Sequence, residues 1–216
     1  PYQIERRNVG VDVMATKNEP IVIEKQGETL SKLMQFLDKE SPKMLSPKAI
    51  APYISCPLKF YFASVARIKS VEELSDDIDK PMFGTILHSA MEDIYSQIKG
   101  VADNSEFLKQ YLKGKQIERA VEQAINKEFL NRADASTEEY TGNMILVRNI
   151  VTKYIRQSII PYDIVHNDFA VMDLESKISH KFELGNGREV LIGGYADRID
   201  SLDNGNLRVV DYKTGK

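Results

Sequence analysis

Apolar side chains recur at helical spacing through the first two thirds of the chain. One stripe follows a cap at Asp79 and runs to about Ile98, a second occupies residues 117–129, and a third occupies residues 145–159 before Pro161. Apolar residues at i, i+3, i+4 and i+7 form one face of an amphipathic helix. The third stripe is expected to bury Ile145, Ile150, Val151, Tyr154, Ile155 and Ile159. We therefore expect a helical N-terminal half whose last helix ends at Pro161.

Beyond Phe169 the apolar pattern changes from the period of a helix to that of a strand. Residues 169–184 alternate, Gly-Asn-Gly at 185–187 forms a turn, and a second alternating run occupies residues 190–199. Successive side chains of a strand point to opposite faces, so this pattern predicts half-buried strands. A third apolar run at residues 207–210 completes an antiparallel three-stranded meander. The predicted fold class is therefore α+β.

The connection between the last two strands decides which side chains share a face. Asp-Asn-Gly between two β-branched runs is a strong hairpin signal. A two-residue loop would place Asp197 opposite Tyr212, on the wrong face. A three-residue loop, with Gly205 in the left-handed place, would put Asp197 opposite Asp211. We expect the three-residue loop or an equivalent bulge.

Two charged residues end the last apolar run. Asp211 and Lys213 are two residues apart, so their side chains point the same way, roughly 7 Å apart along a strand. With Asp197, they would bring two carboxylates and a lysine to one patch of sheet, with room for a phosphate and a metal ion. The alternative is a surface ion pair of little energetic consequence.

Composition limits the classes of protein. The chain has 216 residues, of which 42% are hydrophobic and 28% are charged, as in an ordinary soluble globular protein. It has no apolar run of about 18 residues and no secretory leader, so we expect no membrane association. The single cysteine excludes an internal disulfide framework and favours the cytoplasm. With a net charge of −3, any contact with DNA has to be local.

The motif of two aspartates and a lysine resembles that of a known family. Asp197, a spacing of about fourteen residues and then Asp211-Tyr212-Lys213 at a strand end are similar to the PD-(D/E)XK nuclease superfamily. The sequence GGYADRID…LRVVDYKTG resembles that of its RecB/AddB branch, the nuclease domains of bacterial DNA-end-processing helicase–nucleases. In that branch, Asp197 and Asp211 would bind metal with the carbonyl of Tyr212, and Lys213 would be catalytic.

The resemblance also implies a domain organisation. Residues 46–216 would form a nuclease-like domain with a restriction-endonuclease-like core, a helical insert at about 100–166 and a catalytic sheet at about 169–216. Residues 1–45 are interpreted as a connector or the edge of a preceding domain. Because the chain opens at Pro1 and stops just past a strand, we interpret it as an excerpt, incomplete at the C-terminus.

His88 and Glu175 are the further candidate metal ligands. His88 borders the apolar stripe one turn after Gly84, so its side chain leans over a residue that has none. A histidine at such a boundary is otherwise a packed core residue. The segment GTILHSAME resembles the one that supplies a histidine ligand in RecB/AddB-type nucleases. Glu175 resembles the glutamate on their first core strand, or is a solvated strand residue.

Cys56 lies in a segment, SPKAIAPYISCPLKFYF, that resembles the opening of AddB-type nuclease domains. There the cysteine before the proline is a ligand of an iron–sulfur cluster, so Cys56 is a candidate cofactor ligand. The three other ligands are absent from this chain, so the cluster could form only in a longer one. A lone cysteine is more often a small buried hydrophobic residue.

The resemblance implies a metal-dependent DNA nuclease domain, exonucleolytic at DNA ends, that uses Mg²⁺ or Mn²⁺. It would belong to a RecB/AddB-like helicase–nuclease of DNA repair or recombination. DNA and a helicase partner, or the rest of a longer polypeptide, would be its partners. The family fold continues past Lys213 with a helix and a strand, so we expect this chain alone to be weak or inactive. The alternative is a catalytically inactive nuclease-like module that binds DNA or another protein.

Overall fold

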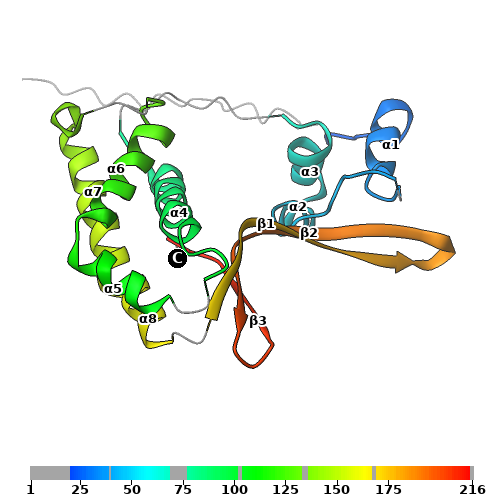
Figure 1. Ribbon diagram of the computed structural model, residues 1–216. Helices are drawn as coiled ribbons and strands as arrows, with labels where there is room; N and C mark the ends of the chain where they lie inside the picture. The colour runs from blue at the N-terminus through cyan, green and yellow to red at the C-terminus, as the bar shows by residue number, and fades with distance from the viewer. Residues whose placement is uncertain are drawn as a thin grey trace, which may run out of the picture.

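Two groups of helices flank a long β-hairpin (Figure 1). The computed structural model describes residues 20–38, 40–68, 77–101, 104–132, 136–166 and 169–214. The helices are α1 (Gly27–Met34), α2 (Pro47–Ser55), α3 (Pro57–Phe60), α4 (Lys80–Ser96), α5 (Ser105–Lys113), α6 (Gln116–Glu128), α7 (Gly142–Tyr154) and α8 (Ile160–Val165). Short 3-10 or π-helical turns are η1 (Tyr61–Val65), η2 (Thr137–Glu139), η3 (Ile155–Ile159) and η4 (Gly185–Gly187).

The sheet is the expected antiparallel meander of β1 (Phe169–Leu184), β2 (Arg188–Leu202) and β3 (Leu207–Val210). The predicted α+β class is confirmed. The β2–β3 ladder pairs Arg198 with Val210 and Ser201 with Leu207, so the three-residue loop is correct. Gly205 in that loop has a φ of +80°, the left-handed conformation that glycine adopts without a steric penalty.

The helices α4 to α8 form the larger lobe, which holds the main core. The packed stripe of α4 contributes Leu87, Ala90, Met91 and Ile94, and α6 contributes Ile117, Val121 and Ile125. All of these side chains are fully or almost fully buried. This agrees with the stripes expected for the two helices. The segment after α4 is attached to the sheet: the amide of Gly100 donates to the carbonyl of Val171 of β1 at 2.8 Å.

The third expected stripe is wrong in part. Ile145, Ile150 and Tyr154 are 44–46% exposed, whereas Met144 and Val147 are buried on the other side of α7. The helical run also continues through residue 161 instead of ending there, because η3 is a π-helical turn and the proline lies in the first turn of α8. A proline in a first turn lacks only an N–H that has no helical partner anyway.

The helices α1 to α3 form a second, smaller group that lies beside the β1–β2 hairpin (Figure 1). Its core is Ala49, Phe60 and Val65. Leu45 attaches this group to β2: its amide donates to the carbonyl of Leu191 at 2.8 Å, and its carbonyl accepts from the amide of Gly193 at 3.2 Å. The structure thus fixes the smaller group to the same strand that carries Asp197.

Parts of the expected organisation lie outside the described residues. These are residues 1–19 and 39 of the proposed connector, residues 69–76, 102–103, 133–135 and 167–168 of the proposed domain, and residues 215–216 at the end of the catalytic sheet. The domain boundary at residue 46 stays a prediction. Among the residues that the structure describes, none of the helices has the length and apolar character that a membrane span requires.

Candidate metal centre

Helix α4 positions His88. Its N-cap, Asp79, accepts a hydrogen bond from the amide of Met82 at 2.9 Å, which satisfies one of the free N–H groups of the first turn. His88 lies in the middle of the helix, with its side chain 30% exposed. A Cβ atom added at Gly84 would lie 3.4 Å from Oγ1 of Thr214, so the glycine lets the segment after β3 approach this helix.

The ladder between β1 and β2 positions Glu175 opposite Asp197. The pairs on either side are Leu174 with Arg198 and Ser176 with Ala196, just beyond a bulge in β1. Glu175 has a φ of +46°, which is rare for a residue with a side chain. Such a conformation costs roughly 1–3 kcal/mol and is often found at functional sites. The strain therefore coincides with a candidate ligand.

Side chains of His88, Glu175 and Asp197 come together. Each offers one ligand atom within 4.8 Å of the others, and Nδ1 of His88 lies 3.2 Å from Oδ1 of Asp197. Glu175 is exposed as a residue, yet desolvation of its carboxyl group, followed by the charge of Asp197, raises its pKa. Within the described part of the chain, no cation or hydrogen-bond donor pairs with the Glu175 carboxylate.

This donor set fits a divalent cation. Two carboxylates and one imidazole are ligands that Mn²⁺ accepts, and carboxylates are the ligands that Mg²⁺ prefers. A bound cation would also offset the repulsion between Glu175 and Asp197 that the raised pKa reflects. The hairpin register singled out Asp197, and the resemblance led to His88 and Glu175.

Asp211 and Lys213 form a separate pair beside this cluster. Nζ of Lys213 donates to Oδ1 of Asp211 at 2.6 Å, and the two side chains are 73% and 46% exposed. The ladder ends at Val210, and the register continued by one residue places Asp197 opposite Asp211, as expected. Asp211 is nevertheless outside the group whose ligand atoms lie within 4.8 Å in the described residues. Its role as a ligand stays a prediction.

Tyr212 connects the pair to the cluster. Its amide N–H donates to Oδ2 of Asp197 at 2.6 Å, and its ring meets that of His88 edge to face, with centroids 6.2 Å apart. The side chain of Asp197 is only 10% exposed and is therefore held from two sides, by His88 and by the backbone of Tyr212. The ligand role expected for the Tyr212 carbonyl stays a prediction.

Sequence reasoning missed a buried ion network next to these residues. Arg198 is 1% exposed, and its guanidinium donates twice to Asp163 of α8, at 2.8 and 3.1 Å. Its Nε donates to Asp200, and its Nη1 also donates to the hydroxyl of Tyr212 at 3.0 Å. Arg198 thereby connects α8 to the segment that carries Asp211 and Lys213.

Other groups complete that network. The hydroxyl of Tyr95 donates to Asp163, and the centroid of the Tyr95 ring lies 4.2 Å from the guanidinium carbon of Arg198. Arg208 of β3 donates to Asp200 at 2.8 Å. A signal was available in the sequence, because Arg198 and Asp200 are two residues apart on the buried face of β2.

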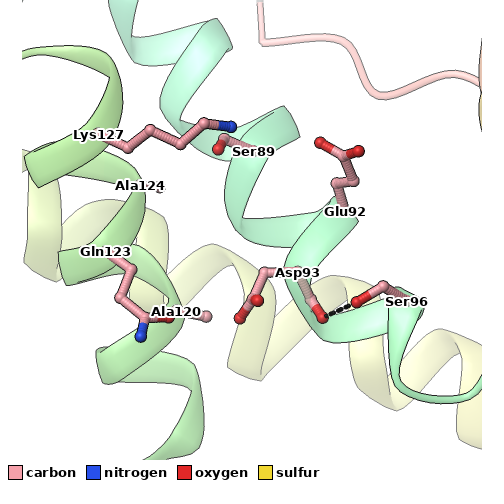
Figure 2. A pocket seen from close by; sticks show the side chains of 8 residues that line it. All are labelled: Ser89, Glu92, Asp93, Ser96, Ala120, Gln123, Ala124 and Lys127. Atoms are coloured by element: carbon pink, nitrogen blue, oxygen red, sulfur yellow. Dashed lines mark hydrogen bonds between the residues drawn. The ribbon is translucent and has the colours of Figure 1, made fainter. Parts of the chain in front are cut away.

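A groove of about 500 Å³ lies between α4 and α6 (Figure 2). Glu92 and Asp93 of α4 and Lys127 of α6 line it. Glu92 is exposed there, and no hydrogen bond joins it to His88 in the described residues. The lining of the groove does not include His88, Glu175 or Asp197, but the charge of Glu92 contributes to raising the pKa of Glu175.

Cys56 lies between α2 and α3, as the cap residue between the two helices. It is a free and exposed cysteine, so the expectation of a buried hydrophobic residue is wrong. No other cysteine is present in the sequence. A role for Cys56 in an iron–sulfur cluster stays a prediction for a longer chain.

Comparisons with known proteins agree with the motif. A sequence profile of the PD-(D/E)XK nuclease superfamily matches residues 44–216. The B subunit of the ATP-dependent helicase/deoxyribonuclease of Carboxydothermus hydrogenoformans is 27% identical over 183 residues, which cover 80% of this chain and 16% of that protein. Its namesake from Clostridioides difficile is 27% identical over 187 residues, covering 79% and 15%. The chain thus spans less than a fifth of the length of these relatives.

Proposed function

This chain belongs to the PD-(D/E)XK nuclease superfamily, and on that premise we propose that it hydrolyses phosphodiester bonds of DNA with a bound divalent cation, Mg²⁺ or Mn²⁺. The observation that supports this proposal is the convergence of His88, Glu175 and Asp197 from a helix and two strands. Convergence of ligands from separate elements is typical of a metal site, whereas a solvated charge needs no such arrangement.

The three residues of the cluster would hold the cation. When bound, it would act as a Lewis acid on the scissile phosphate and lower the pKa of the attacking water. Tyr212 would keep Asp197 oriented, because its amide N–H already donates to Oδ2 of that carboxylate. The strained backbone of Glu175 would direct its carboxylate at the same point.

Lys213 would supply positive charge to the phosphate as negative charge develops. Its present partner is Asp211, and an exposed ion pair of this kind is worth only about 0–1 kcal/mol. A phosphate could therefore attract Lys213 away from Asp211 at little cost. The released carboxylate of Asp211, opposite Asp197 in register, would then be available to the cation.

The similarity to the B subunits of helicase/deoxyribonucleases supports a more specific proposal. We infer that the substrate is DNA at or near an end, cleaved exonucleolytically, and that the domain belongs to a longer helicase–nuclease of DNA repair or recombination. The helicase portion, in the same polypeptide or in a partner, would deliver the strand. A cytoplasmic location would follow from that role.

Two measurements on the full-length protein test the nuclease proposal. Asp197→Asn keeps the size of the side chain but removes its charge, so we expect cleavage of linear DNA to fall by about 100-fold or more. Saturable Mn²⁺ binding, followed by titration calorimetry, should weaken strongly in the same variant. The control is Asp203→Asn, an exposed aspartate in the β2–β3 loop, which should change neither. Full cleavage by Asp197→Asn would refute the proposal.

The alternative function is a nuclease-like module that binds DNA or protein without cleaving. The observation in its favour is that Lys213 pairs with Asp211, outside the cluster. The same titration separates the two proposals. Mn²⁺ binding that needs Asp197 favours the enzyme, and undetectable Mn²⁺ binding with intact DNA binding favours the module.

A further inference from the structure

A cavity of about 390 Å³ in the smaller helical group has an unusual charge. Phe36, Lys43, Ser64 and Arg67 are among its lining residues, which include two cations and no carboxylate. Four other cavities in the described residues each include carboxylates, namely Glu92, Glu118, Asp163 and Asp211. The net charge of the chain is −3, and this cavity differs from those four in having positive charge without a carboxylate.

The two cations have no anionic partner among the described residues. The ammonium of Lys43 lies 5.1 Å from the centroid of the Phe36 ring, which attracts it without neutralising its charge. Arg67 is exposed and adopts a φ of +54°, and no hydrogen bond or ion pair within the described ranges holds its guanidinium. Within the described residues, both groups are therefore available to a ligand.

The electrostatics of Lys43 support this view. Burial, followed by repulsion from Arg67 and Lys32, lowers the pKa of Lys43. Three positive charges thus lie close enough to disfavour one another, although Lys32 also has Glu28 as a partner at 2.8 Å. An anion in the cavity would relieve this repulsion.

We propose that this cavity binds a phosphate group. The guanidinium of Arg67 offers a planar set of donors that suits phosphate oxygens, the ammonium of Lys43 adds a compact charge, and the hydroxyl of Ser64 can donate a further hydrogen bond. Given the proposed nuclease function, on which this part rests, the source of the phosphate is the backbone of bound DNA.

The place of the cavity in the fold fits that source. Lys43 lies two residues before Leu45, which pairs with Leu191 and Gly193 of β2. Gly193 precedes Asp197 by four residues, or roughly 13 Å along a strand. DNA that follows β2 away from the candidate metal centre would therefore bring a backbone phosphate, several nucleotides from the cleaved bond, to Lys43 and Arg67.

The test measures binding and not cleavage. Fluorescence anisotropy with labelled DNA, in EDTA and at several salt concentrations, would compare the full chain with Lys43→Met and Arg67→Met. Losing one phosphate contact should lower the salt slope of log Kobs by about 0.7 for single strands or 0.9 for duplexes. At 0.1 M salt this corresponds to a roughly fivefold to eightfold weaker affinity. Lys59→Met, on α3 but outside the cavity, is the matched control and should change neither.

Two further measurements separate the possible sources and exclude misfolding. Arg67→Lys keeps the charge and should keep the salt slope. Inorganic phosphate, titrated while the amide of Ser64 is followed by NMR, tests for a free phosphate compound as ligand. If the cavity variants lose only the NMR response to phosphate and bind DNA normally, the cavity is a phosphate site. Its ligand is then a free phosphate compound and not the DNA backbone.

One result would overturn the proposal: unchanged DNA affinity, unchanged salt slope and an unchanged phosphate response in Lys43→Met and Arg67→Met. The outcome does not depend on whether the chain cleaves DNA. A protein that does not cleave DNA can still show a reduced salt dependence of DNA affinity in these variants. An active nuclease can show an unchanged one. Failure here and failure of the nuclease proposal are therefore distinguishable.

Discussion

Replacing Arg198 by methionine should destabilise the protein more than any exposed charge substitution. Methionine keeps an unbranched stem of similar length but removes the guanidinium that joins Asp163 to Asp200. Those carboxylates are 2% and 0% exposed, so neither can turn to water. Arg208 still donates to Asp200 at 2.8 Å, but its nearest approach to Asp163 is 3.6 Å. Asp163 therefore loses its main counter-ion.

The expected cost follows from this burial. Removing one partner of a buried ion pair costs roughly 3–5 kcal/mol, because the other charge stays buried without compensation. For a chain of this size, each kcal/mol lowers the melting temperature by about 2–4 °C, so the fall should be about 6–20 °C. An exposed pair offers the contrast. Lys32→Met removes the partner of the exposed Glu28 and should change the free energy of unfolding far less than Arg198→Met does.

Urea denaturation at neutral pH, followed by circular dichroism, measures both variants. A second change makes the test specific. Adding Asp163→Asn to Arg198→Met removes the uncompensated charge, keeps an acceptor for Tyr95, and should restore about 1 kcal/mol or more. If Arg198→Met loses less than about 1 kcal/mol, or if the double variant regains nothing, the ion network does not have the role assigned to it.

Two other changes test the fold. Gly193→Ala should destabilise the hairpin by about 1–3 kcal/mol, because the new Cβ would lie 2.1 Å from the carbonyl oxygen of Ile178, and a reduced urea midpoint would show it; an unchanged midpoint would contradict this contact. Burial raises the pKa of Tyr140 to about 12. Because this folded-state pKa lies above the unfolded-state pKa of about 10, the contribution of Tyr140 to the free energy of unfolding is fully present below pH 10. It is lost as the pH rises through about 12. Unfolding titrations should therefore show a shallower alkaline decline in Tyr140→Phe, and an identical decline would argue against that burial.

Local chemistry determined what could be predicted from the sequence. The Asp-Asn-Gly loop fixes the register of β2 and β3, because only a left-handed residue closes a three-residue turn of this type and Gly205 supplies it. The sequence made His88 and Asp197 candidate ligands through motifs and register, but their contact depends on tertiary packing that periodicity does not report. For Glu175, the alternating pattern around it predicted a strand. The bulge and the positive φ that orient its side chain depend on pairing with the partner strand.

The rest depended on long-range packing. Burial of Arg198 on an apolar strand face could not be predicted from the sequence, because its partner Asp163 lies 35 residues earlier in the chain. The face of α7 was misassigned for a related reason: a stripe of Ile145, Ile150 and Tyr154 is as regular as the one that is buried. Periodicity identifies a helix, but which apolar side faces the core depends on what packs against it.

The π-helical turn η3 has a consequence for how this chain tolerates changes in length. Such a turn is equivalent to one residue inserted into an α-helix, and each residue advances a helix by about 100°. Here the inserted residue sets the rotational phase at which Asp163 of α8 meets Arg198. Deleting one residue from Ile155–Ile159 would keep every helix-forming residue beyond it and still turn that carboxylate away from its arginine. In this stretch the number of residues is therefore constrained more tightly than their identity.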